Sequence, residues 1–175
     1  MVNSFKLLCV KITLKLEMSI NQYSFVTLWK IAAPLQDVWE AIEDSNNLPS
    51  WWPAVLSVNT IAEGNADGIG RKEQQTWRGI LPYQLSFLIK ITSVDYLKSI
   101  EFAASGDLEG IGKWTFIDEG NWVTLQHDWQ VKTTQQWLNV LTPVLKPLLA
   151  WNHDEIMRWG AKGLAQKLSA KLIQY

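Results

Sequence analysis

The amino-acid sequence predicts an α+β fold: a seven-stranded, curved antiparallel sheet that wraps around a long C-terminal helix, with two short helices after the first strand. Three observations support this prediction. Apolar and polar residues alternate in residues 24–31 and again in residues 55–132, as they do in half-buried strands. Apolar residues recur at helical spacing in residues 35–42 and in the C-terminal stretch. Because the sheet and the long helix each have an apolar surface to bury, we expect them to pack on each other.

The first strand and the two short helices precede the main sheet. In "SFVTLWKI", residues 24–31, every second residue from Phe25 onward faces one side. In "APLQDVWEAIED", Pro34 suits the first turn of a helix, and the apolar residues after it share one face. The stretch "NNLPSWW" is typical of a loop followed by a second short helix, which we expect to end near Pro53.

Two adjacent tryptophans, Trp51 and Trp52, lie on this second helix in "LPSWWPAV". Neighbours on a helix point about 100° apart, so the two indoles face different surroundings. They can both close one end of the sheet, one of them can touch a ligand, or they can form a surface for a partner. The chain has 11 tryptophans, and such large rings either fill a wide core or line a cavity for an apolar molecule.

Six further strands are predicted, separated by turn residues such as those of "EGNADGIG" and "EGN". Gly110 and Gly112 inside the fifth of these strands indicate a bend or a close approach to the backbone. The predicted strands are "VLSVNTIA", "RKEQQTWRG", "YQLSFLIKITSVD", "SIEFAAS", "DLEGIGKWTFIDE" and "WVTLQHDWQVK".

The remainder is predicted to be helical. "TTQQWLNVL" indicates a short helix, which Pro143 and Pro147 interrupt. A long helix then runs from Val144 or Leu148 to about Leu172. One face of it carries Leu149, His153, Ile156, Met157, Gly160, Gly163, Leu164 and Lys167.

Composition bounds the class of protein. A chain of 175 residues suits one domain, which we assign to residues 18–175, with residues 1–17 as an extension or a misassigned start. The net charge of −1, without a basic stripe, argues against a nucleic-acid partner. Cys9 is the single cysteine, which excludes an intramolecular disulfide and favours a cytoplasmic location. No stretch is apolar enough for an integral membrane segment, we expect no metal and no cofactor, and the oligomeric state is not indicated.

Several segments resemble a known family. They are "AAPLQDVWEAIEDSNNLPSWWPAV", "GIGRKEQQTWRGILPY", "GDLEGIGKWTF" and "HDEIMRWGAKGLAQKL". Together they are similar, in order and over about residues 22–170, to the START-like (SRPBCC) superfamily, specifically to the polyketide cyclase/dehydrase and lipid-transport type proteins. The resemblance implies the helix-grip, or START/Bet v 1-like, fold. It implies less about function, since lipid and hormone carriers, aromatic-ring cyclases, quinone-binding factors and chaperone activators share this fold.

Two histidines are candidate functional residues. His127 lies on a strand face that is otherwise apolar, where it can orient a ligand carbonyl, act as an acid or base, or simply be a hydrogen-bonded core residue. His153 lies on the inward stripe of the long helix but near its start, where we expect exposure. The two can meet across a cavity, although no third ligand for a metal is evident.

One further strand face carries polar residues. Arg71, Glu73, Gln75 and Trp77 share a side of their strand. If that side faces inward, the first two form a polar end to an apolar pocket, and if it faces outward they form a surface ion pair. The opposite face would bury two cations, which argues for the inward orientation, and the surface ion pair stays open as the alternative.

These patterns favour a protein that binds a small hydrophobic or amphipathic molecule, such as a lipid, polyketide or quinone-like compound, between the sheet and the C-terminal helix. A polyketide cyclase or dehydratase with His127 as acid or base is one alternative, and a protein-interaction module of the chaperone co-activator kind is another. The predicted ligand-binding residues are Trp77, Glu73, Phe87, Trp114, His127, Trp129, His153, Ile156, Met157 and Gly160.

Overall fold

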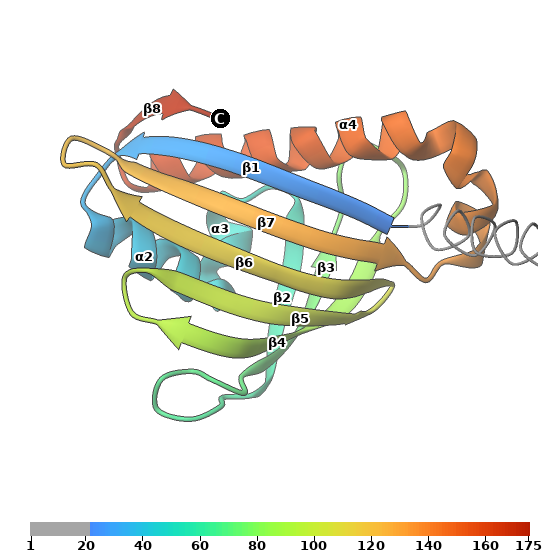
Figure 1. Ribbon diagram of the computed structural model, residues 1–175, viewed down its shortest axis with the longest axis horizontal. Coiled ribbons are helices and arrows are strands. Elements are labelled where there is room, and N and C mark those ends of the chain that lie inside the picture. The colour runs from blue at the N-terminus through green and yellow to red at the C-terminus, as the bar shows by residue number, and fades with distance from the viewer. Residues whose placement is uncertain (1–21) are drawn as a thin grey trace, which may run out of the picture.

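The structure is a computed structural model that describes residues 22–175, with the backbone alone described for residues 136–145. Its elements are β1 (Gln22–Ala32), α2 (Leu35–Glu43), the 3₁₀ turn η1 (Ser45–Asn47), α3 (Leu48–Trp51), β2 (Val55–Ala62), β3 (Lys72–Trp77), β4 (Leu85–Asp95), β5 (Ser99–Gly106), β6 (Leu108–Asp118), β7 (Val123–Thr133), α4 (Gln136–Lys167) and β8 (Lys171–Gln174). The strands form one sheet in the order β2-β3-β4-β5-β6-β7-β1-β8, and Figure 1 shows α4 running along it. The predicted helix-grip architecture is therefore confirmed.

The sheet has eight described strands rather than seven, because the chain turns back after α4. The helix ends at Lys167, before the predicted Leu172. Ser169 then adopts a left-handed conformation (φ 50°), and the Ala170 N–H donates to the Ala165 carbonyl at 2.8 Å. The chain returns along β1 as β8, where Leu172 pairs with Ile31. Glycine usually adopts the left-handed conformation after a helix, so a serine at this position did not predict the end of the helix.

Helix α4 also begins earlier than predicted, and it is one helix rather than two. It runs from Gln136 through Pro143 and Pro147 without a break. Each proline removes a backbone N–H donor and crowds the preceding turn. A helix that also packs on the rest of the protein can bend at such a position and continue. Figure 1 shows the first turns of α4 bending away from the axis of the rest.

Fully buried side chains lie where the C-terminal half of α4 meets α3 and β1. Trp29, Ile31 and Leu164 are fully buried there. Two glycines of α4 leave space for close neighbours. A Cβ atom on Gly160 would lie 2.4 Å from the ring of Trp52, and one on Gly163 would lie 1.8 Å from the backbone carbonyl oxygen of Trp51. This end of the molecule is filled by side chains.

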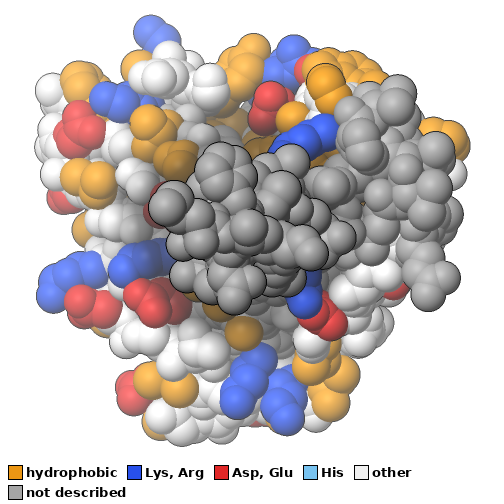
Figure 2. All heavy atoms as spheres, turned by 45° about the vertical axis from the view of Figure 1, so that its right-hand side comes forward, with side chains coloured by type: hydrophobic (Ala, Val, Ile, Leu, Met, Phe, Trp, Pro, Cys, Tyr) orange, Lys and Arg blue, Asp and Glu red, His pale blue; other side chains and the backbone are white. Residues whose placement is uncertain are grey.

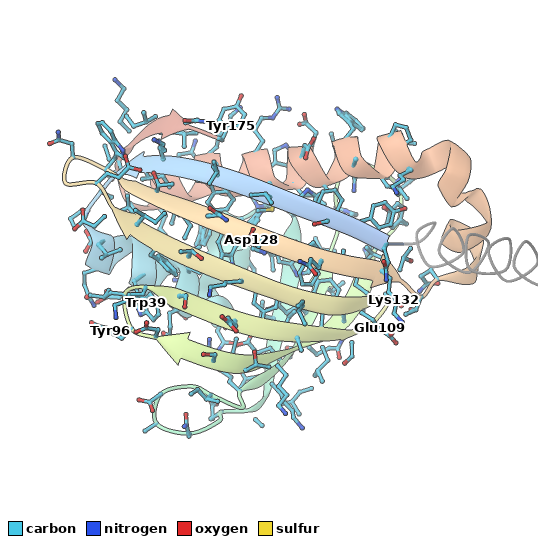
Figure 3. The ribbon with its side chains drawn as sticks, viewed as in Figure 1. Trp39, Tyr96, Glu109, Asp128, Lys132 and Tyr175 are labelled. Carbon is cyan, nitrogen blue, oxygen red and sulfur yellow. The ribbon has the colours of Figure 1, made fainter. Side chains whose placement is uncertain are left out.

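The strand faces separate charge from apolar surface. On β7 the inward side carries His127 and Trp129, while Asp128 lies on the outer side, as Figure 3 shows for the labelled Asp128. Glu109 and Lys132, also labelled there, form an ion pair of 2.9 Å between β6 and β7. The inner side of the sheet is left to aromatic, aliphatic and a few polar residues.

Candidate functional site

A cavity of about 210 Å³ lies between the inner face of the sheet and the middle of α4. Its wall consists mainly of aromatic and aliphatic side chains from β1, β3 to β7, α3 and α4. A dry apolar cavity of about 150 Å³ is enough for benzene, so this one has room for a substituted ring. The hollow is possible because indoles fill one end of the interior and leave the middle open.

The structure places all but one of the predicted site residues around this cavity. The lining residues among them are Trp77, Glu73, Phe87, Trp114, His127, Trp129, His153, Ile156 and Met157. Gly160 is the correction: it lies on the predicted helix face, but one turn further toward the packed end, where Trp52 and Trp29 cover it. The inward face of the helix was predicted correctly. The sequence did not show how far along that face the cavity extends.

Strand β3 turns its polar residues inward. Glu73 is 1% exposed, and its Oε1 accepts a hydrogen bond from Ser45 Oγ and lies 2.8 Å from Arg71 Nε. Its Oε2 accepts from Gln75 Nε2 at 2.9 Å, and Gln75 Oε1 accepts from Trp77 Nε1 at 2.9 Å. The surface ion pair is therefore excluded for Arg71 and Glu73. The polar groups at this end of the cavity bond one another.

His127 stands in the aromatic part of the wall. It lies opposite Trp114 in the β6–β7 register, and the two ring centroids are 4.1 Å apart. Its Nδ1 is buried and has no hydrogen-bond partner among the described residues. Burial, together with a smaller effect of the nearby His153, lowers the pKa of His127 to about 3. At neutral pH the ring is uncharged, and one of its nitrogens is available to a guest.

His153 faces the cavity from α4, and the expected exposure is wrong. Its side chain is 15% exposed and stacks on the ring of Phe25 with centroids 3.8 Å apart. Burial lowers its pKa, against a smaller raising effect from Asp154. Asp154 Oδ1 lies 3.6 Å from Nδ1, which is too long for a hydrogen bond. Both ring nitrogens are buried without a hydrogen-bond partner in the described part of the chain.

The two adjacent tryptophans have different roles. Trp51 packs against α4 beside Gly163, where a Cβ atom would lie 1.8 Å from the Trp51 carbonyl oxygen. Trp52 lines the cavity, and its Nε1 donates to the Ile156 carbonyl at 2.9 Å. Trp51 is thus structural closure, while Trp52 closes the interior and forms part of the cavity wall.

The lining residues that were not singled out from the sequence include Tyr23, Ser45 and Asn152. Tyr23 alternates with Phe25 on β1, so extending the strand pattern by two residues would have found it, and its hydroxyl is buried without a described partner. Asn152 Oδ1 accepts from the N–H groups of Ile80 and Leu81 at 2.9 and 3.1 Å. It thereby fastens the β3–β4 loop to α4. No sequence pattern marked it.

Gly112 shapes the wall from the sheet side. A Cβ atom there would lie 2.3 Å from the ring of Phe102 and 2.7 Å from that of Trp129. The close approach that the mid-strand glycine indicated is therefore made by two aromatic rings, and both residues line the cavity.

Within the described residues, no group of three or more His, Cys, Asp or Glu side chains is arranged to hold a metal ion. In the same part of the chain, no helix has the length and apolar character needed to cross a membrane.

Comparison with known proteins agrees with this geometry. The sequence profile of the family described as "Polyketide cyclase / dehydrase and lipid transport" matches residues 31–152, which is more than half of the chain. No curated protein matches the sequence significantly.

Solved structures with the same fold include three that illustrate its range. A START superfamily protein from Mycobacterium smegmatis is 17% identical, with a TM-score of 0.67 over 85% of this chain and 97% of its own. The Zhui aromatase/cyclase from Streptomyces sp. R1128 is 13% identical, with a TM-score of 0.62 over 83% of this chain and 95% of its own. The di-domain aromatase/cyclase BexL from the BE-7585A biosynthetic pathway is 16% identical, with a TM-score of 0.67 over 90% of this chain. The chain spans only 54% of the length of BexL, and at these identities the likeness shows the fold alone.

Proposed function

Because this chain belongs to the polyketide cyclase/dehydrase and lipid transport family, we propose that it binds a small hydrophobic or amphipathic molecule in the cavity between the sheet and α4. The observation that carries the proposal is the combination of an apolar hollow of about 210 Å³ with buried nitrogens of His127 and His153 that have no described partner. An unpaired buried polar group is costly, and a guest with a hydroxyl or carbonyl group would remove that cost. Burial of the rest of the guest against the aromatic wall would supply most of the affinity.

Different lining residues would make the apolar contacts and the hydrogen bonds to the guest. Trp77, Phe87, Trp114 and Trp129 would contact the apolar body of the guest, together with Ile156 and Met157. His127 and His153 would each offer one donor and one acceptor as neutral imidazoles. Glu73, whose two oxygens are already occupied, would act on the guest only through the shape and polarity of the cavity end.

Native mass spectrometry of the protein purified from its own host tests this proposal. The wild-type chain should carry an additional small-molecule mass. Ile156→Trp should lose it, because the larger ring occupies the cavity, whereas Ile156→Leu, which conserves volume, should retain it. A bare-chain mass for the wild type, or a bound molecule in the Ile156→Trp variant, contradicts the proposal.

A cyclase or dehydratase activity is the second candidate, and the free Nδ1 of His127 in an aromatic cavity is the observation that favours it. The low pKa of this histidine counts against it, since a base is most effective when its pKa lies near the working pH. The two functions separate in His127→Ala: a binding protein should retain most of its affinity for the guest, while an enzyme should lose turnover of a linear polyketide analogue.

An interaction module of the chaperone co-activator kind has less support. That hypothesis expects an exposed apolar patch above a solid interior, and here the interior contains a cavity.

A further inference from the structure

The charged residues of the cavity wall are confined to one end. Among the described lining residues, Arg71 and Glu73 are the members of a charged type, and the other titratable ones are Tyr23, Tyr83, His127 and His153. Figure 2 shows acidic and basic side chains interspersed on one face of the surface of the molecule. Whether the cavity accepts a charged guest therefore depends on what Arg71, Glu73 and the two histidines can offer.

Arg71 has its nitrogens directed at protein groups. Its Nη1 donates to Glu43 Oε1 at 2.7 Å and its Nη2 to the Glu43 carbonyl at 3.0 Å, while its Nε lies 2.8 Å from Glu73 Oε1. Two carboxylates thus face one guanidinium. A guest carboxylate would meet no free cation here, and would approach a group whose charge is more than balanced.

Glu73 is equally unavailable to a guest cation. Ser45 and Arg71 occupy Oε1, and Gln75 occupies Oε2. An ammonium group would have to replace one of these partners and leave it buried without a bond. Replacing a partner in a buried ion pair is costly, because the freed charge stays out of water.

Among the described residues, neither histidine has a buried carboxylate beside it to balance a positive charge. His127 has aromatic neighbours on β5, β6 and β7: Phe102, Trp114 and Trp129. His153 has Phe25 on one side, and Asp154, whose side chain is 75% exposed, at 3.6 Å. Their surroundings favour neutral rings, which offer hydrogen bonds rather than charge.

We infer that the cavity selects uncharged guests that carry a hydrogen-bonding oxygen, such as that of a hydroxyl, carbonyl or ether group, and that it excludes ions of either sign with the same apolar body. The inference rests on the proposed function and makes it more specific. An ion entering the cavity would lose its hydration and gain no partner of opposite charge. A neutral phenol or ketone would lose far less, and would gain hydrogen bonds to Tyr23, His127 or His153.

Three matched probes test the inference: 4-nitroanisole, which is always neutral; 4-nitrobenzoate, which is an anion at pH 7; and 4-nitrophenol, which titrates near neutral pH. Calorimetry with the wild-type chain should show 4-nitroanisole binding at least about ten-fold more tightly than 4-nitrobenzoate, the equivalent of about 1.4 kcal/mol. Adding protein to 4-nitrophenol at constant pH should reduce the visible absorbance of the phenolate. The phenolate takes up a proton from the buffer as the neutral phenol is removed into the cavity.

Glu73→Gln is the variant to compare with the wild-type chain. It removes the negative charge of Glu73, one of the two carboxylates that balance the charge of Arg71. The ratio of the affinities for 4-nitrobenzoate and 4-nitroanisole should then shift toward the anion, by about ten-fold if one buried charge becomes available. The wild-type series stands by itself if this variant does not fold.

The outcomes separate the two proposals. If 4-nitroanisole and 4-nitrobenzoate bind the wild-type chain equally well, or if phenolate absorbance rises on adding protein, the charge preference is wrong and the binding function stands. If none of the three probes binds, the binding function itself fails, and the charge preference fails with it.

Discussion

The two halves of α4 meet the sheet in opposite ways. Toward its C-terminus, Gly160 and Gly163 let the indoles of Trp52 and Trp51 come into contact with the helix, and Leu164 is fully buried. Toward the middle, His153, Ile156 and Met157 of the same face border the cavity. The helix face is continuous, so the difference comes from what opposes it. Small residues facing tryptophans produce a solid contact, whereas large residues facing a curved sheet leave a hollow.

The packed half should be the less tolerant of added volume. Gly163→Ala would place a Cβ atom 1.8 Å from the carbonyl oxygen of Trp51, a backbone atom that cannot rotate away. Overpacking of this kind costs about 3 kcal/mol of unfolding free energy, measured by chemical denaturation. Gln166→Ala, at an exposed site on the same helix, is the control and should change stability little. Equal stability of the Gly163→Ala variant and the wild type would contradict the tight contact.

The burial of His127 in the cavity half should make the free energy of unfolding depend on pH. His127 has a pKa of about 3 in the folded chain and 6.5 as its ordinary value, so the unfolded chain binds the extra proton between these limits. The stabilisation is complete above pH 6.5 and is lost as the pH falls toward 3, by about 1.4 kcal/mol per pH unit. His127→Phe keeps a ring against Trp114 and removes that proton.

Denaturation at several pH values between 7 and 5, a range above most carboxylate titration, measures the difference. The slope of unfolding free energy against pH should be smaller in His127→Phe than in the wild type. His153 shifts in the same direction and remains in both proteins, so it does not cancel the effect. Identical slopes would mean that His127 is accessible to protons in the folded chain.

Gly160→Ala should affect both the packed half of α4 and the cavity. The added methyl group would meet the side chain of Trp52, not backbone, at 2.4 Å. We therefore expect a smaller loss of stability than for Gly163→Ala, about 1–2 kcal/mol. Because Trp52 also lines the cavity, its displacement should weaken guest binding as well. A stability loss with unchanged affinity for 4-nitroanisole would show that the indole moves away from the cavity.

The smallest effect is expected at the link between α4 and the β3–β4 loop. Asn152→Ala removes the acceptor for the N–H groups of Ile80 and Leu81. Water can replace it at this partly exposed loop, so the cost should be about 1 kcal/mol. Stopped-flow measurement should show faster dissociation of a bound guest, while Asn152→Asp, which keeps the acceptor oxygen, should dissociate as the wild type does.

Much of the fold was predictable because strands and helices here follow plain periodicities. The strand β2, residues 55–62, was predicted with its observed bounds, and alternation on β3 correctly turned Glu73 and Gln75 inward. The errors lie where an element's end depends on tertiary contacts. Ser169 adopts a left-handed turn that serine seldom signals, and α4 continues through two prolines.

The candidate site, like the fold, was predictable where its residues follow a local sequence pattern. A lone histidine on an apolar strand face indicated His127, and the helical stripe indicated His153, Ile156 and Met157. The stripe could not tell which of its residues face a hollow and which face an indole, so Gly160 was included wrongly as a lining residue. Asn152 was missed because its contacts are with a loop 71 and 72 residues away in sequence, and no local pattern records such a contact.

The strand β8 has a practical consequence for handling the molecule. It pairs with Lys30, Ile31 and Ala32 of β1, and Figure 3 shows Tyr175 beside it. Tyr23, at the opposite end of β1, is eight residues from Ile31, or roughly 26 Å along an extended strand. A label or surface anchor attached after Tyr175 would therefore sit far from the tyrosine that borders the hollow, leaving immobilised protein free to exchange its guest.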